Sequence, residues 1–125
     1  MGATGATIGG GHGRLQGLYG LMIDAVLSHR IVLANGSIVT ASRTQNADLF
    51  YALRGAGQNF GVITETIFKT YDDPAPHGLY YNVDMLFFDN QLESVLTVIN
   101  DIIPNQPGEL ALIFLLSEGD ASVSL

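Results

Sequence analysis

The chain has 125 residues, of which 47% are apolar and 14% are charged, and its formal net charge is −7 at pH 7. This length and composition allow one domain-sized core and exclude a disordered tail, while the few, scattered basic residues argue against a nucleic-acid surface. Because there is no cysteine, disulfides and thiolate metal sites are excluded as well.

A glycine-rich segment lies near the start of the chain. Residues 7–20 read TIGGGHGRLQGLYG and contain six glycines, whose ordering costs backbone entropy. A P-loop is excluded because no Gly-Lys-Ser/Thr ending follows Gly11 or Gly13. A nicotinamide-binding turn over residues 2–7, with Asp24 on the ribose, is disfavoured because no strand precedes it. Two interpretations stay open: a turn that lets two segments approach closely, or a cradle of backbone N–H groups for a phosphate-bearing cofactor.

The strongest local pattern predicts a β-hairpin. Residues 30–34 (RIVLA) and 37–41 (SIVTA) are β-branched runs. The pair between them, Asn35-Gly36, favours a type I′ turn with positive φ at both positions.

A short helix and a strand are predicted after the hairpin. Asn46 is placed to cap a helix of about two turns, Asp48 suits its first turn, and Gly55 can end it in a left-handed conformation. Residues 60–68 alternate as a strand does, with one face made of Val62, Thr64, Thr66 and Phe68 and the other of Ile63 and Ile67. Because both faces are largely apolar or β-branched, this strand is expected in the interior of a sheet.

Turn-forming residues at 70–78 indicate a boundary between two units. Beyond it, the pattern predicts a strand over 79–88, a helix over 90–103 and a buried strand over 110–116. That last run is the longest apolar stretch, but it is too short to span a bilayer, and no charged-then-apolar leader opens the chain. One β-α-β unit cannot close a core alone, so we expect the polypeptide to end within a domain.

Two stretches together carry a resemblance to a known family. They are residues 9–42, GGGHGRLQGLYGLMIDAVLSHRIVLANGSIVTAS, and residues 46–64, NADLFYALRGAGQNFGVIT. In order and spacing, from about Gly5 to about Thr70, they resemble the second half of the FAD-binding domain of p-cresol methylhydroxylase-type flavoproteins. The resemblance is greatest to the berberine bridge enzyme-like oxidases of fungi and plants.

The resemblance implies an α+β fold, in which residues 1–71 are the C-terminal part of the FAD-binding domain and residues 72–125 begin an α/β substrate domain. It implies FAD as cofactor and a small-molecule substrate, an alcohol, sugar or alkaloid-like metabolite, whose hydride passes to flavin N5 before dioxygen reoxidises the flavin. The positions that it places at the cofactor are Gly9, Gly10, Gly11, His12, Gly13, Asp24, Gly61 and Val62. No catalytic residue is assigned, and Tyr80 and Tyr81 are not given that role.

Several of these residues have an equally ordinary structural explanation. His12 suits loop packing, Asp24 a helix or turn cap, and Arg54 the C-terminal end of a helix rather than a phosphate. The aromatic side chains are expected in the core rather than as stacking platforms: Tyr19, Phe50, Tyr51 and Phe60.

The sequence also departs from the family pattern. The upstream Gly-Gly-His element that wraps the pyrophosphate is not in these residues, and no cysteine is present to form a thioether to FAD. We therefore expect weak FAD affinity and no turnover from the chain by itself. The alternative is a non-catalytic remnant or interaction protein that holds no FAD and associates through exposed sheet edges, with neither nucleic acid nor membrane as partner. The compartment stays open.

Overall fold

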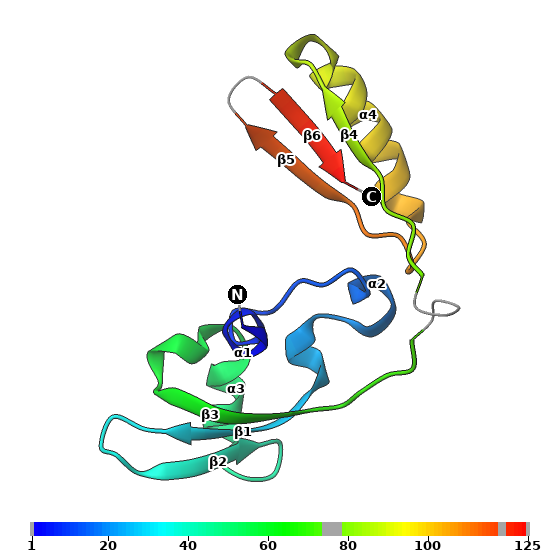
Figure 1. The fold of residues 1–125 in the computed structure, drawn as a ribbon. Helices are drawn as coiled ribbons and strands as arrows, with labels where there is room; N and C mark the ends of the chain where they lie inside the picture. The colour runs from blue at the N-terminus through cyan, green and yellow to red at the C-terminus, as the bar shows by residue number, and fades with distance from the viewer. Residues whose placement is uncertain (1, 74–78, 118–119, 125) are drawn as a thin grey trace. The chain divides into compact units, whose positions relative to one another are not determined.

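The two halves of the chain form separate sheets. The computed structural model describes residues 2–73, 79–117 and 120–124, and the chain divides into the units Met1–Asp72 and Asp73–Leu125 (Figure 1). Residues 74–78 of the expected boundary lie outside the described residues.

The first unit is a three-stranded antiparallel sheet with helices. Its strands β1 (Val26–Val32), β2 (Ile38–Ser42) and β3 (Val62–Phe68) lie in the order β2-β1-β3. Its helices are α1 (Ala3–Thr7), α2 (Gln16–Tyr19) and α3 (Ala47–Ala56), and a 3₁₀ turn at Met22–Ala25 leads into β1.

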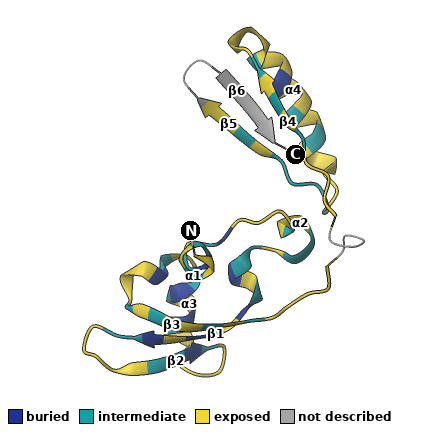
Figure 2. Cartoon of the chain, viewed as in Figure 1, coloured by how far each residue is buried: buried dark blue, intermediate teal, exposed yellow. Residues whose placement is uncertain are grey.

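The core of this unit lies between the sheet and α3, as the dark blue segments of Figure 2 show. It consists of Ile23, Val26, Ile31, Ala41, Phe50 and Leu53. Leu53 and Ile31 are fully buried, and removing a side chain of this size from a core costs about 2–5 kcal/mol. The packing of the helix on the strands therefore fixes the unit.

The predicted hairpin is confirmed, but the predicted type I′ turn is wrong. β1 and β2 pair with Ile31 opposite Val39, and the Leu33 carbonyl accepts from the Gly36 N–H at 2.9 Å. Gly36 has a φ of +81°, whereas Asn35 has no positive φ. The loop is thus one residue longer, a three-residue connection that ends in a glycine at positive φ.

The predicted helix is confirmed as α3, but the expected side-chain cap at its N-terminus is absent. Asn46 takes the cap position at φ +48°, yet its side chain makes no cap hydrogen bond. Its amide instead donates to the Thr40 carbonyl at 2.8 Å. Asp48 lies in the first turn, and Gly55 interrupts the helix with a φ of +121°.

The strand predicted over residues 60–68 is found over Val62–Phe68, but its predicted position in the sheet and its predicted faces are wrong. Among the described strands β3 lies at an edge, since β1 occupies the centre. A register shift between Arg30 and Ile31 leaves Thr64 without a register partner on β1, although its hydroxyl donates to the Arg30 carbonyl at 3.3 Å. This bulge reverses the alternation, so Ile63 and Phe68 both contact the core.

The aromatic side chains of the first unit divide into two groups. Phe50 is buried, and Tyr19 stacks on Tyr71 with 4.3 Å between ring centroids. The expectation of a core position is wrong for Tyr51, which is 81% exposed, and for Phe60, which is 39% exposed.

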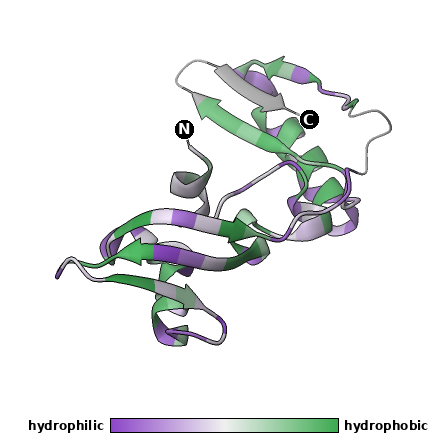
Figure 3. Cartoon of the chain, turned by 60° about the horizontal axis from the view of Figure 1, so that its bottom comes forward, coloured by the Kyte–Doolittle hydropathy of each residue, from purple (hydrophilic) through white to green (hydrophobic). Residues whose placement is uncertain are grey.

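The second unit has its own sheet in the order β4-β6-β5, antiparallel throughout. β4 (Asp84–Phe87), α4 (Leu92–Ile102) and β5 (Ile113–Ser117) are the three predicted elements, each shorter than expected. The predicted burial of the last strand is wrong, because Ile113, Leu115 and Leu116 are 48%, 59% and 66% exposed. Because β6 (Asp120–Ser124), which was not predicted, separates them, β4 and β5 run parallel. Figure 3 shows β5, beside the grey strand, as hydrophobic along its length.

No helix in the described part of the chain combines the length and the apolar character that a membrane span requires.

Candidate functional site

The glycine-rich segment leaves α1 and is pinned by its carbonyl groups. The Gly10 carbonyl accepts from the Ile23 N–H at 3.1 Å, and the Gly11 carbonyl accepts from the Met22 N–H at 2.9 Å. Both glycines have positive φ, +118° and +74°. The segment is therefore held against the 3₁₀ turn that precedes β1.

A second attachment holds the start of the segment on α3. The Ile8 carbonyl accepts from the N–H groups of Gly55 at 3.1 Å and Gly57 at 3.4 Å. A Cβ on Gly57 would lie 2.6 Å from the Cβ of Ile8, so the close contact requires glycine there.

The N–H groups at the centre of the segment are free. Within the described residues, the N–H groups of Gly11, His12 and Gly13 donate to no acceptor. His12 and Gly13 are exposed, while Gly11 is buried. Successive free N–H groups beside a residue of positive φ are the donors that bind anions in backbone nests.

The glycines of the segment are there for different reasons. A Cβ on Gly11 would lie 2.6 Å from the Cβ of Met22, so the fold itself requires this glycine. A Cβ on Gly13 would meet nothing within 4 Å, and one on Gly9 would meet only the Ala6 carbonyl oxygen at 3.6 Å. Packing within the described chain therefore gives no reason for glycine at positions 9 and 13.

The side chain of His12 makes a hydrogen bond with a residue nearby in the sequence. Its Nδ1 lies 2.9 Å from Oε1 of Gln16, one helical turn further along the chain. A role toward the cofactor stays a prediction.

Both carboxylate oxygens of Asp24 have partners. Oδ2 accepts from the Leu21 N–H at 3.0 Å, which caps the 3₁₀ turn, and Oδ1 accepts from Nη2 of Arg54 at 2.6 Å. Nη1 of Arg54 also donates to the Ile23 carbonyl at 2.8 Å. The cofactor contact predicted for Asp24 would have to compete with these bonds.

Gly61 and Val62 lie at the start of β3. Gly61 has a φ of +149°, and a Cβ there would clash with the Val32 carbonyl oxygen, so the β1–β3 pairing requires glycine. Val62 pairs with Val32 and is 68% exposed. No hydrogen bond between described residues joins these two positions to the glycine-rich segment.

One buried polar residue was missed from the sequence. His29 is fully buried on β1, and its Nδ1 lies 2.9 Å from Oγ1 of Thr66, while Nε2 has no partner among the described residues. Burial lowers the pKa of His29 below its usual value. Starting the predicted strand a few residues earlier would have placed His29 on the face of Ile31.

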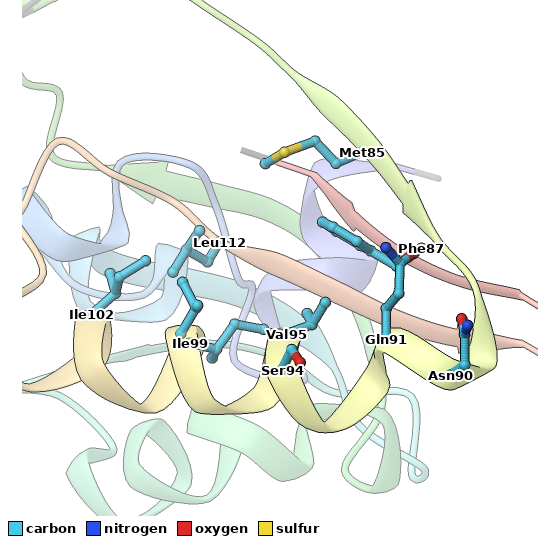
Figure 4. Close-up of a pocket in the computed structure, with 10 residues that line it drawn as sticks. Met85, Phe87, Asn90, Gln91, Ser94, Val95, Ile99, Ile102 and Leu112 are labelled. Carbon is cyan, nitrogen blue, oxygen red and sulfur yellow. The ribbon is translucent and has the colours of Figure 1, made fainter.

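A cavity of 410 Å³ lies between α4 and the strands of the second unit (Figure 4). In the figure, side chains of α4 point toward Met85, Phe87 and Leu112. The lining contains no acid, base or cation: Met85, Phe87, Asn90, Gln91, Ser94, Val95, Val98, Ile99, Ile102 and Leu112. It offers apolar contact and no catalytic group. In the described part of the chain, no cluster of His, Asp or Glu could hold a metal ion.

No protein-family model matches the chain, but curated relatives do. The FAD-linked oxidoreductase azaL of Aspergillus niger is 44% identical over 112 residues, which are 90% of this chain and 24% of that protein. OXR1 of Pyricularia oryzae, also named an FAD-linked oxidoreductase, is 45% identical over 82% of this chain and 20% of its own length.

Solved structures agree with the sequence matches. BBE-like 1 of Physcomitrella patens has a TM-score of 0.83 at 29% identity, over 99% of this chain and 27% of its own. A glucooligosaccharide oxidase of Acremonium strictum has a TM-score of 0.78 at 30% identity, over 99% of this chain and 26% of its own. The resemblance to the berberine bridge enzyme-like flavoenzymes is confirmed. So is the expected α+β fold class.

The chain spans about a quarter of the length of these relatives. In the Acremonium strictum oxidase the FAD is described as 6-S-cysteinyl and 8α-N1-histidyl. The present 125 residues contain no cysteine, so a cysteinyl link cannot come from them.

Proposed function

We propose that the chain is a cofactor-contacting part of an FAD-dependent oxidoreductase, and that the segment of residues 9–13 holds FAD through its backbone. The observation that carries the proposal is the run of backbone N–H groups that begins with Gly11, His12 and Gly13 and donates to no acceptor among the described residues. The Gly10 and Gly11 carbonyls, in contrast, accept from the turn that precedes β1. The names of the curated relatives, FAD-linked oxidoreductases, support the choice of cofactor.

The residues present fit such a group. Glycine at positions 9 and 13 has no explanation from packing within the described chain, and a missing Cβ lets a ligand approach the backbone closely. The exposed backbone N–H groups of His12 and Gly13 can donate to a phosphate, as the N–H groups of a backbone nest do. Gly61 and Val62 belong to the proposed contact as well, although Gly61 is already required by β1.

When bound, FAD would supply hydride acceptance at N5 and electron transfer to dioxygen. The substrate in this proposal is an alcohol, a sugar or an alkaloid-like metabolite, and carbohydrate oxidases are among the structural neighbours. The chain's own contribution is to hold the cofactor with rigid backbone. We assign no catalytic side chain to it.

An NMR titration of the purified chain with FAD tests the proposal. We expect weak, saturable binding that shifts the amide signals of Gly11, His12 and Gly13, without turnover. Gly13→Ala should weaken FAD binding about tenfold, equal to ~1.4 kcal/mol, and leave the free energy of unfolding unchanged, because the new methyl group meets only the ligand. Gly5→Ala is the matched control, since its Cβ also meets nothing within 4 Å and lies outside the segment.

A second function is favoured by a specific observation. Many large apolar side chains of the second unit are exposed, among them Leu86 at 78% and Phe88 at 71%. They support an interaction protein that holds no FAD. Amide signals that stay unmoved at millimolar FAD would decide for this alternative and against the first.

A further inference from the structure

Arg54 connects α3 to the turn that holds the glycine-rich segment. Its Nη1 donates to the Ile23 carbonyl at 2.8 Å, and its Nη2 donates to Oδ1 of Asp24 at 2.6 Å. The bond to the Ile23 carbonyl is part-buried, whereas the ion pair is open to water, because the Asp24 side chain is 46% exposed. A guanidinium suits this task because it donates in two directions from one rigid plane.

Asp24 fixes the same turn from the other side. Its second carboxylate oxygen accepts from the Leu21 N–H at 3.0 Å. The carboxylate thus joins the cation of Arg54 to the backbone at the start of the turn. The close fit extends to Gly20, where a Cβ would lie 2.9 Å from Oδ2 of Asp24.

The 3₁₀ turn at Met22–Ala25 in turn holds the glycine-rich segment in position through backbone hydrogen bonds. The N–H groups of Met22 and Ile23 donate to the carbonyls of Gly11 and Gly10 at 2.9 and 3.1 Å. The Ile23 residue therefore donates to Gly10 with its N–H and accepts from Arg54 with its carbonyl. Arg54 is therefore connected to the glycine-rich segment through a single intermediate residue, Ile23.

We infer that Arg54, paired with Asp24, is a positioning residue for the cofactor-binding backbone. In this role Arg54 contacts no cofactor. It holds the turn whose N–H groups bond the Gly10 and Gly11 carbonyls, and this leaves the N–H groups of residues 11–13 available to a ligand. Its charge is already neutralised by Asp24, which leaves it poorly suited to a phosphate. The inference rests on the proposed function for its consequence on FAD, but not for its effect on the backbone.

Hydrogen exchange and FAD titration of the same variants test it. Arg54→Met and Asp24→Asn should each raise the exchange rates of the Met22 and Ile23 amides about tenfold, with the β1 amides unchanged. Each should also weaken FAD binding about tenfold, and the double variant should be no weaker than either single one. Arg54→Lys can donate to only one of the two acceptors, so its exchange rates and its FAD affinity should lie between those of Arg54→Met and wild type.

Arg43→Met is the matched control for the lost charge. Arg43 lines the same shallow hollow beside α3 as Arg54 but makes no ion pair with a described residue. It should change neither the exchange rates nor the FAD affinity.

Two results would overturn the inference: unchanged exchange at Met22 and Ile23 in Arg54→Met, or affinity losses of the two single variants that multiply in the double variant. The second result would mean that Asp24 touches FAD directly. If FAD leaves the wild-type amides of residues 11–13 unmoved, the proposed function fails, and the exchange rates still decide the role of Arg54.

Discussion

At the scale of single residues, His29 shows what burial does to a titratable group. Its ring lies among Thr66 of β3, Phe50 of α3 and the register partner Ala41 of β2, none of which carries a charge. Protonation would give both ring nitrogens a hydrogen, and Nε2 has no acceptor among the described residues. The neutral ring is therefore the form that the fold accepts.

This predicts acid sensitivity of the first unit. Because burial lowers the pKa of folded His29 below 6.5, the unfolded chain takes up the proton more readily. The stability that the neutral ring provides is complete above about pH 6.5 and is lost as the pH falls toward the folded-state pKa, by at most ~1.4 kcal/mol per pH unit. Urea unfolding from pH 8 to pH 5, followed at β1 amide signals, measures it.

Two histidine variants separate this effect from other titrations. His29→Gln removes the titrating ring and should flatten the pH dependence of the unfolding free energy. His12→Gln should retain it, because His12 is exposed. An unfolding free energy that does not change between pH 8 and pH 5 in wild type would refute the assignment.

At the scale of elements, the sequence predicted the strands and helices better than their connections. The β-branched runs on either side of Asn35-Gly36 are joined by a short connection that favours antiparallel pairing, so the sequence was sufficient to predict the hairpin. The turn type could not be predicted. Whether Asn35 and Gly36 both adopt positive φ, or Gly36 alone, depends on the register of the whole β-ladder. The bulge at Thr64 was hidden for the same reason: it is set by pairing with β1, not by β3 itself.

The observed turn makes its own prediction at Gly36. A Cβ there would meet nothing within 4 Å, so a substitution costs only the strain of the φ of +81°. Gly36→Ala should lower the free energy of unfolding by about 1–2 kcal/mol, and Gly36→Asn by less, because asparagine tolerates this conformation better. Urea unfolding of both variants measures the difference. Equal stability of Gly36→Ala and wild type would contradict the turn geometry.

At the scale of the whole molecule, the sequence located the candidate site through its many glycines. It did not show which contacts hold the glycine-rich segment in place. Six glycines in residues 7–20 marked the segment, but one set of glycines serves the fold and another has no packing role. Only contacts distant in sequence reveal this, such as Gly57 on Ile8. The Arg54–Asp24 pair was equally hidden, because the two residues are 30 positions apart.

The second unit leaves an apolar surface on its sheet. Leu86 of β4 and Leu115 of β5 both lie opposite residue 122 of β6, so they share one face. They are 78% and 59% exposed, whereas Met85 and Phe87 line the cavity beneath α4 on the other face. Apolar side chains grouped on an open sheet face favour association in water.

We therefore predict concentration-dependent self-association through this face. Light scattering coupled to size exclusion should give an apparent mass above 13.3 kDa that rises with protein concentration. The double variant Leu86→Thr, Leu115→Thr introduces β-branched residues that suit a strand and removes the apolar surface, so it should stay at the mass of one chain. Tyr51→Thr, which removes an 81% exposed aromatic from the first unit, should associate as wild type does. A wild-type chain that remains at 13.3 kDa at every concentration would show that the exposed leucines do not drive association.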